Sequence, residues 1–183
     1  MNTKKIEEGI ELVLDGLHTE LNWRADPEYK DTPKRVARFY EEFFTRDGKP
    51  LTAFPEKFDQ MVVLAHHTDW ALCPHHLLPV KLDISLAYIP RGRVLGLSKL
   101  ARLIGMNLHH PVSQEELTDR LAQDLSNCVR PTPHGSAVLI YGEHACMQMR
   151  GVKTTGYSIT SDVRGVFRSR PEVKEEFLAL VRR

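Results

Sequence analysis

Two apolar runs, MVVLA at residues 61–65 and ISLAYI at residues 84–89, decide the fold that we expect for this chain. Both have the length and the aliphatic side chains of strands, and Pro90 and Gly92 close the second run. We therefore expect the two runs to be antiparallel neighbours. A second strand pair is predicted from SAVLIYGEHACMQMRG, which follows the turn PTPHG, and from YSITSDVRGVF.

Helices are predicted before these runs and at the C-terminal end of the chain. Apolar residues at helical spacing predict a first helix over about residues 3–21. In a second helix we expect Thr32 to cap the N-terminus, Pro33 to occupy the first turn, and the end to lie near residues 47–48. A last short helix is predicted from Pro171.

Two further helices are predicted between the strand pairs. Ser98 is expected to cap one that runs to about Leu108. Ser113 with Glu116 forms the capping-box pattern of another, which runs to about Cys128. Helices and strand pairs without strict β-α-β alternation are typical of the α+β class. The expected fold is an antiparallel sheet packed against helices.

Size and charge narrow the class of protein. At 183 residues the chain fits one structural domain overall, with an N-terminal helical segment over residues 1–50 followed by residues 51–183. Its 25 Lys and Arg nearly balance 24 Asp and Glu, which argues against a general affinity for nucleic acid or an anionic membrane. Because no apolar run approaches the roughly 18 residues of a membrane span, and acidic residues interrupt the N-terminus, we expect a cytoplasmic protein.

The first candidate for a functional site is a short cysteine–histidine motif. The chain has three cysteines, an odd and low number that favours reduced thiols over a disulfide framework. In Cys73-Pro74-His75-His76, a thiol and an imidazole lie three positions apart and are within reach of one metal ion. Alone, the motif is also compatible with a buried cysteine beside two histidines of a turn.

A second cluster strengthens the metal hypothesis. His144 and Cys146 lie two apart in a predicted strand, so their side chains would project from one face, which Gln148 and Arg150 continue. Polar residues at this spacing indicate that the face lines a site. A strand with one face in solvent would explain Gln148 and Arg150, but not Cys146, because cysteine is seldom exposed.

Together the two clusters supply a ligand set. Two cysteines and one histidine are a known pattern of catalytic zinc, with one position open for water: Cys73, His76 and Cys146. Zinc lowers the pKa of such a water towards about 7, and His75 and His144 beside it could move protons. The alternative is a closed structural site, whose fourth ligand would be Cys128, His66 or His67.

The segment GRVLGLSKLARL offers a candidate phosphate site. Lys99 and Arg102 lie on one face of the helix that Ser98 is expected to begin. Backbone N–H groups, the helix dipole and two cations favour a phosphate there, although a solvated basic face is the commoner explanation of two charges. Glu115, in the first turn of the next predicted helix, either favours that helix dipole or binds a donor-rich edge of a ligand.

Four motifs, CPHHLLP, AYIPRGRVLGLSKLARLI, QEELT and HACMQMRGV, occur in the order and approximate spacing of the GTP cyclohydrolase I family. With DTPKRVARFYEEFF before them and GVFRSRPEVKEEFLALVR after them, the chain resembles that family over about residues 26–182. The resemblance implies a tunnelling fold, in which antiparallel sheets of several subunits join into a barrel. It also implies a homo-oligomer, commonly a decamer of two pentameric rings, with sites at subunit boundaries.

The resemblance further implies roles for individual residues. The zinc ligands would be Cys73, His76 and Cys146, and the catalytic histidines His75 and His144. The substrate-binding residues would be Gln114, Glu115, Ser98, Lys99, Arg102, Arg150 and, from a neighbouring subunit, Arg35. Glu115 would recognise the guanine edge, because a carboxylate can accept hydrogen bonds from N1–H and the 2-amino group together.

The implied reaction is a zinc-dependent hydrolysis of the imidazole ring of GTP. Zinc-bound hydroxide would add to C8, the ring would open with His144 as the main acid, and formate would leave. The ribose carbons would then rearrange to give 7,8-dihydroneopterin triphosphate. This product can serve the synthesis of folate, biopterin or a deazaguanine nucleoside.

Two departures from the family pattern keep alternatives open. Pro74 stands where the family usually has glutamate, and Glu116 where it usually has arginine. They motivate a second hypothesis, a non-catalytic GTP-binding regulatory relative of the same fold. A third hypothesis is a tunnelling-fold enzyme that acts on a pterin or deazapurine. The SKLAR segment argues against it, since a triphosphate site would then have no purpose.

Overall fold

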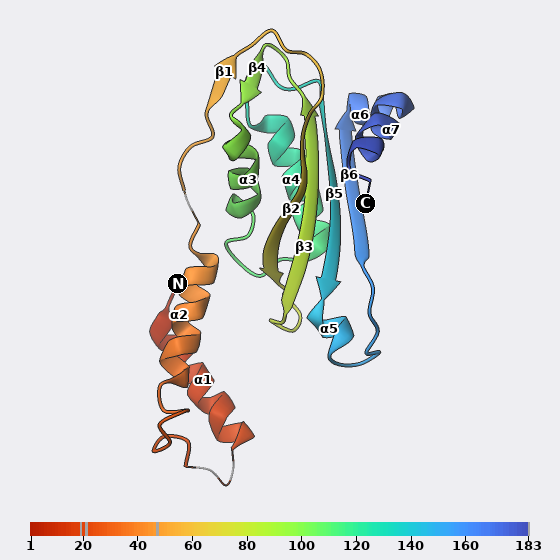
Figure 1. Ribbon diagram of the computed structural model, residues 1–183. Helices are drawn as coiled ribbons and strands as arrows, with labels where there is room; N and C mark the ends of the chain where they lie inside the picture. Colours follow the sequence, from red (N-terminus) through yellow and green to blue (C-terminus); the bar gives the residue numbers. More distant parts are fainter. Residues whose placement is uncertain (19, 21, 47, 183) are drawn as a thin grey trace. The chain divides into compact units, whose positions relative to one another are not determined.

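The computed structural model describes residues 1–18, 20, 22–46 and 48–182, and the chain forms two compact units, Met1–Arg46 and Asp47–Arg183 (Figure 1). The first unit contains two helices, and the second contains all the described strands. Within these described ranges, no helix is both long enough and apolar enough to cross a membrane.

The first helix is shorter than the sequence pattern predicts. α1 (Thr3–Leu17) is followed by His18 as its C-cap residue. Trp23 Nε1 donates a hydrogen bond to Asp15 Oδ1 at 2.8 Å, which ties the next segment back onto the last turn of the helix. The predicted end at residue 21 lies outside the described residues.

The second helix, α2 (Thr32–Phe44), packs against α1 and has a proline in its first turn, as predicted. Its N-cap residue is Asp31, so the prediction that Thr32 caps the helix is wrong by one residue. The Thr32 hydroxyl accepts a hydrogen bond from Arg35 Nη2 at 3.1 Å instead of one from the backbone. The helix ends before the predicted residues 47–48, the first of which is outside the described residues.

The second unit is built on a four-stranded antiparallel sheet in the order β2-β3-β5-β6. Its strands are β2 (Val62–Leu72), β3 (Pro79–Ile89), β5 (Gly135–His144) and β6 (Ser158–Gly165). Both predicted strand pairs are confirmed, and pairing of β3 with β5 joins them. A separate two-stranded sheet consists of β1 (Ala53–Pro55) and β4 (Arg93–Leu95).

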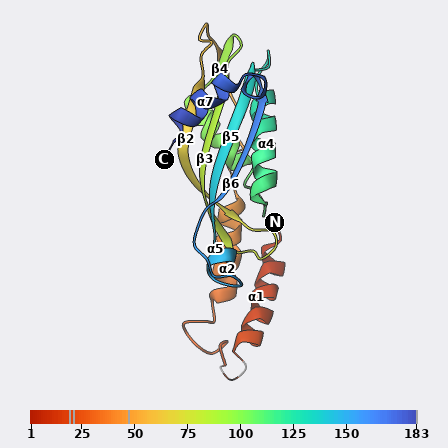
Figure 2. The same ribbon diagram turned by 90° about the vertical axis from the view of Figure 1, so that its right-hand side faces the viewer.

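Helices cover both faces of this sheet (Figures 1 and 2). On one face lie α3 (Leu97–Met106) and α4 (Gln114–Asn127), and on part of the other lie α6 (Val166–Ser169) and α7 (Pro171–Leu180). Side chains alternate along β3, so Leu82 and Ile84 join the core under α3 and α4, whereas Ala87 joins the smaller core under α6 and α7. The predicted α+β class, with an antiparallel sheet packed against helices, is confirmed.

The two predicted serine caps have different outcomes. At the start of α4, Ser113 Oγ accepts a hydrogen bond from the Glu116 N–H at 3.2 Å, as predicted. At the start of α3 the N-cap residue is Gly96, so Ser98 lies inside the helix and the prediction that it caps α3 is wrong. The Lys99 N–H donates to the Gly96 carbonyl at 2.8 Å, which closes the first turn earlier than expected.

Candidate metal centre and its cavity

The turn between β2 and β3 directs a thiol and two imidazoles towards one point. Cys73 N–H donates to the Leu78 carbonyl at 2.9 Å, and Leu77 N–H donates to the Cys73 carbonyl at 2.8 Å. Leu77 has a positive φ of 53°, a left-handed conformation that reverses the chain within the turn. As a result, Nδ1 of His75 lies 3.6 Å and Nδ1 of His76 lies 3.8 Å from the sulfur of Cys73.

The third candidate ligand reaches the same point from the end of β5. This strand ends at His144, and α5 (Ala145–Gln148) begins at the next residue. The prediction that Cys146 shares a strand face with His144 is therefore wrong. The Met149 N–H donates to the Ala145 carbonyl at 2.8 Å, so the chain is already helical at Cys146. α5 lies at the same end of the sheet as the β2–β3 turn (Figure 1), which brings Cys146 to the other ligands.

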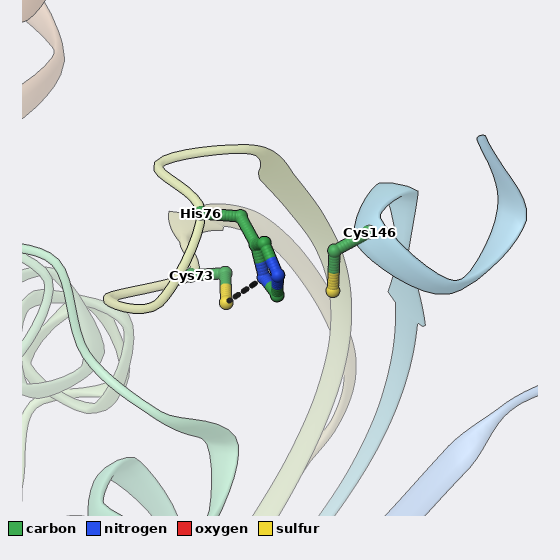
Figure 3. Close-up of side chains that lie close together, drawn as sticks. All are labelled: Cys73, His76 and Cys146. Atoms are coloured by element: carbon green, nitrogen blue, oxygen red, sulfur yellow. Dashed lines mark hydrogen bonds between the residues drawn. The ribbon is translucent and has the colours of Figure 1, made fainter. Parts of the chain in front are cut away.

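The three predicted ligands form a compact group. The ligand atoms of Cys73, His76 and Cys146 all lie within 4.8 Å of one another. In Figure 3 the imidazole of His76 lies between the two sulfur atoms. Arg150 Nη1 donates to Nε2 of His76 at 2.6 Å, so the Nδ1 of that ring is the nitrogen that faces Cys73. Two sulfur atoms and one imidazole nitrogen are a donor set that fits a bound metal ion.

The candidates for a fourth ligand lie elsewhere. Cys128, at the C-terminal end of α4, donates to the Leu125 carbonyl at 3.1 Å, and burial raises the pKa of its thiol to about 11. On the sheet, Nδ1 of His66 lies 3.2 Å from Oδ2 of Asp83. In the part of the chain that the structure describes, neither these residues nor His67 join the three-residue group. The geometry therefore favours a site with an open position over a closed one.

A cavity of about 230 Å³ lies beside the metal-ligand group. Its apolar lining includes Ala71, Val80, Leu82, Val112 and Leu117. Its polar lining includes Cys73, His75, His76, Ser113, Gln114, Glu115, His144, Cys146 and Ser158. A concave, partly apolar surface with a few converging polar groups is typical of a ligand site.

His144 occupies the wall of this cavity between α4 and β5. Its Nε2 lies 2.8 Å from Oε1 of Gln114, the first residue of α4. Burial lowers the pKa of His144, and the nearby carboxylate of Glu115 opposes that shift. The two candidate acid–base histidines, His75 and His144, thus line the same cavity as the metal-ligand group.

The structure brings together only part of the predicted substrate-binding set. Gln114 and Glu115 line the cavity. Arg150 forms a hydrogen bond with His76, which also lines it. The predicted phosphate-binding residues of α3 are not among the described residues that line it: Ser98, Lys99 and Arg102. Arg35 belongs to the other unit, where its Nη2 donates to the Glu28 carbonyl at 2.5 Å.

Two residues beside the Gln114 side chain were missed in the sequence. A Cβ atom on Gly142 would clash with Oε1 of Gln114, so the observed position of this amide depends on glycine here. An isolated glycine inside a strand pattern is a recognised sign of such a close approach, and the run SAVLIYGEH contains one. Thr160, whose Oγ1 lies 3.1 Å from Nε2 of Gln114, has no comparable local signal.

Fold and site together define an α+β protein with a candidate metal centre of two cysteines and one histidine beside a polar cavity. The sequence profile described as GTP cyclohydrolase I matches residues 7–182. The chain belongs to the GTP cyclohydrolase I family. The resemblance inferred from the sequence motifs is therefore confirmed.

Relatives named GTP cyclohydrolase 1 are similar to the chain over nearly their whole length. The relative from Hydrogenobaculum sp. (strain Y04AAS1) is 36% identical, with 100% of this chain and 99% of that protein covered. The relative from Sulfurihydrogenibium sp. (strain YO3AOP1) is 38% identical, with coverage of 99% and 96%. The relative from Aquifex aeolicus (strain VF5) is 37% identical, with coverage of 100% and 98%.

Among solved structures, the archaeosine synthase QueF-Like in the apo form is similar with a TM-score of 0.44 and 19% identity. That likeness covers 56% of this chain and 92% of the other. It is too low to add to the family assignment, which stands on the sequence.

Proposed function

We propose that this chain hydrolyses the imidazole ring of GTP, releases formate and rearranges the remainder to 7,8-dihydroneopterin triphosphate. One observation carries the proposal: the metal-ligand group lies beside the same cavity that Glu115, His75 and His144 line. Membership of the GTP cyclohydrolase I family supports it. The alternative, a regulatory relative that binds GTP without hydrolysing it, would not need metal ligands beside acid–base residues.

The metal in this proposal is zinc, held by Cys73, His76 and Cys146. Two thiolates and an imidazole suit zinc, and three protein ligands leave the position that a catalytic site needs. When bound, the ion supplies the Lewis acidity that lowers the pKa of a coordinated water. The chain's part is to hold the ligands in place, as the turn between β2 and β3 does for Cys73 and His76.

Glu115 is proposed to bind the guanine base. Its carboxylate accepts from N1–H and the 2-amino group, the two donors on that edge of guanine. The cavity of about 230 Å³ is smaller than the roughly 300–1,000 Å³ of pockets that enclose drug-sized ligands. It therefore fits the base but not the whole nucleotide, and we place the ribose and triphosphate outside it.

His75 and His144 are proposed to carry the protons of the reaction. Water adds to C8 of the base, and a bond from C8 to a purine nitrogen then breaks. The proton that this nitrogen requires comes from His144, which lines the cavity where the base is placed. His75, whose Nδ1 lies 3.6 Å from the sulfur of Cys73, is close enough to the ligand group to take a proton from the attacking water.

We propose that the triphosphate is bound at a boundary between subunits of a homo-oligomer, a decamer of two pentameric rings. The predicted phosphate-binding residues of α3 are absent from the described lining of their own chain's cavity. A neighbouring copy that presents its α3, or its Arg35, to the mouth of the cavity would supply the missing cations. Arg150 would add a charge from the chain that holds the base.

The test is to give GTP to the purified protein and to measure bound zinc, released formate and pterin fluorescence after oxidation. Zinc-dependent formate together with a fluorescent pterin supports the proposal. The variants Cys146→Ala and Cys128→Ala form a matched pair, since only the first removes a proposed ligand. GTP binding without formate from the zinc-loaded protein would refute the enzyme and favour the regulatory relative.

A further inference from the structure

The side-chain amide of Gln114 joins three elements at the wall of the cavity. The residue is 4% exposed at the start of α4. Its Nε2 lies 3.1 Å from the Ile140 carbonyl oxygen on β5 and 3.0 Å from the Ser158 carbonyl oxygen on β6. Its Oε1 lies 2.8 Å from Nε2 of His144. Both ends of the amide are therefore engaged within the chain.

The direction of these hydrogen bonds follows from their partners. Carbonyl oxygens only accept, so the NH₂ group of Gln114 must face Ile140 and Ser158, and its oxygen must face His144. A flipped amide would set three acceptors against one another with no hydrogen between them. Because an amide oxygen cannot donate, the proton of the remaining hydrogen bond must lie on Nε2 of His144.

Two hydroxyl groups support the same orientation. Thr118 Oγ1 lies 2.7 Å from the backbone carbonyl oxygen of Gln114 and must donate to it. Thr160 Oγ1 lies 2.6 Å from Thr118 Oγ1, and its own hydrogen is then directed to that atom. The oxygen of Thr160, 3.1 Å from Nε2 of Gln114, is left to accept and shares the two amide hydrogens with the Ile140 and Ser158 carbonyls, which only the unflipped amide allows.

The hydrogen bond between Gln114 and His144 also needs room beside β5. A Cβ atom on Gly142 would clash with Oε1 of Gln114 and would lie 3.0 Å from Nε2 of His144. The absence of a side chain at this position therefore lets the amide oxygen reach the imidazole.

We propose that Gln114 is a positioning residue that holds His144 in the tautomer protonated at Nε2, so that Nδ1 is the nitrogen that exchanges a proton with the substrate. The catalytic use of Nδ1 rests on the proposed function, whereas the tautomer does not. This role differs from substrate binding, because the amide's hydrogen-bonding groups are already engaged.

The tautomer can be measured without turnover. Zinc-loaded protein labelled with ¹⁵N-histidine is studied by magic-angle-spinning NMR, and the His144 signals are assigned by their loss in His144→Ala. We expect a protonated Nε2 and an unprotonated Nδ1 for the neutral ring of the wild-type chain. A neutral ring protonated at Nδ1 would overturn the proposal, even if every Gln114 variant failed to fold.

The variant Gln114→Met keeps the length of the side chain and removes both ends of the amide. Gln123→Met, at an exposed position of the same helix, is the matched control. We expect Gln114→Met to give a mixture of the two His144 tautomers and to lower kcat about 10- to 100-fold with KM changed less than about twofold. The control should change neither measurement.

Two results for Gln114→Met would count against the positioning role. A raised KM with unchanged kcat, and with the Nε2 tautomer retained, would return Gln114 to substrate binding. A lower kcat with the tautomer retained would show that the amide acts in another way. If the wild-type protein releases no formate from GTP, the proposed function fails, while the NMR result still decides the tautomer.

Discussion

The β5–α5 junction and the C-terminal end of α4 each carry a partly buried cysteine, and burial raises the pKa of both thiols. At the junction, Cys146 lies close to Cys73 and His76, with all three ligand atoms within 4.8 Å of one another. At the end of α4, Cys128 donates to the carbonyl of the preceding helical turn and packs against the main core. A perturbed thiol therefore does not mark a site by itself, whereas convergence with other donors does.

The largest expected effect is that of Cys146→Ala. With one of three ligands removed, we expect zinc content to fall from about one ion per chain to near zero, and formate release to fall below detection. Atomic absorption of the purified protein measures the metal, and thermal unfolding shows whether the chain still folds. Full zinc occupancy in this variant would show that the junction is no more a metal site than the end of α4.

The next effect separates chemistry from metal binding within the junction. His144→Ala removes the proposed acid but none of the three ligands, so we expect zinc content to remain and formate release to fall about 10²- to 10⁴-fold. Stopped assays for formate and pterin locate the step that is lost. Turnover at the wild-type rate would exclude His144 from the proton transfers.

Glu115 and Glu116 allow a comparison between adjacent carboxylates. Glu115 lines the cavity, whereas Oε1 of Glu116 lies 3.3 Å from Nη1 of Arg120 on the same helix. In Glu115→Gln an NH₂ group replaces one acceptor and opposes the donors of guanine, so we expect kcat/KM for GTP to fall about 10- to 100-fold. Glu116→Gln should change it less than about twofold. Equal losses in the two variants would contradict base recognition by Glu115.

Local patterns were sufficient for most of the sheet and for two of the three metal ligands. The runs at residues 61–65 and 84–89 and the Ser113 cap depend on neighbours in the sequence, and the structure contains them. The C-x-x-H spacing of Cys73 and His76 needs only one turn to converge. These features could be predicted because their causes lie within a few residues.

The features that could not be predicted depend on contacts between distant segments. The sequence HACMQMRG continues the strand pattern, but β5 ends at His144 and the helical turn of α5 places Cys146. The contacts of Gln114 with Ile140, His144 and Thr160 join α4 to two strands that follow it in the chain. The spacing of residues in the sequence does not indicate such contacts, so the orientation of His144 could be assigned only from the structure.

The smallest expected effect is that of Cys128→Ala, which tests the other side of the comparison. Because Cys128 lies outside the metal-ligand group, we expect unchanged zinc content and turnover within about twofold of wild type. Burial raises the pKa of this thiol to about 11 from an ordinary value of 9.0, so the folded chain favours its neutral form. That contribution to stability is fully present below about pH 9 and declines as the pH rises towards 11. Between pH 8 and pH 10.5, the free energy of unfolding of the wild type should therefore fall by about 1 kcal/mol more than that of Cys128→Ala, as measured by thermal unfolding. This figure is already lowered to allow for the partial exposure of the thiol to solvent. Loss of zinc in this variant would instead place Cys128 among the ligands and remove the distinction between the two regions.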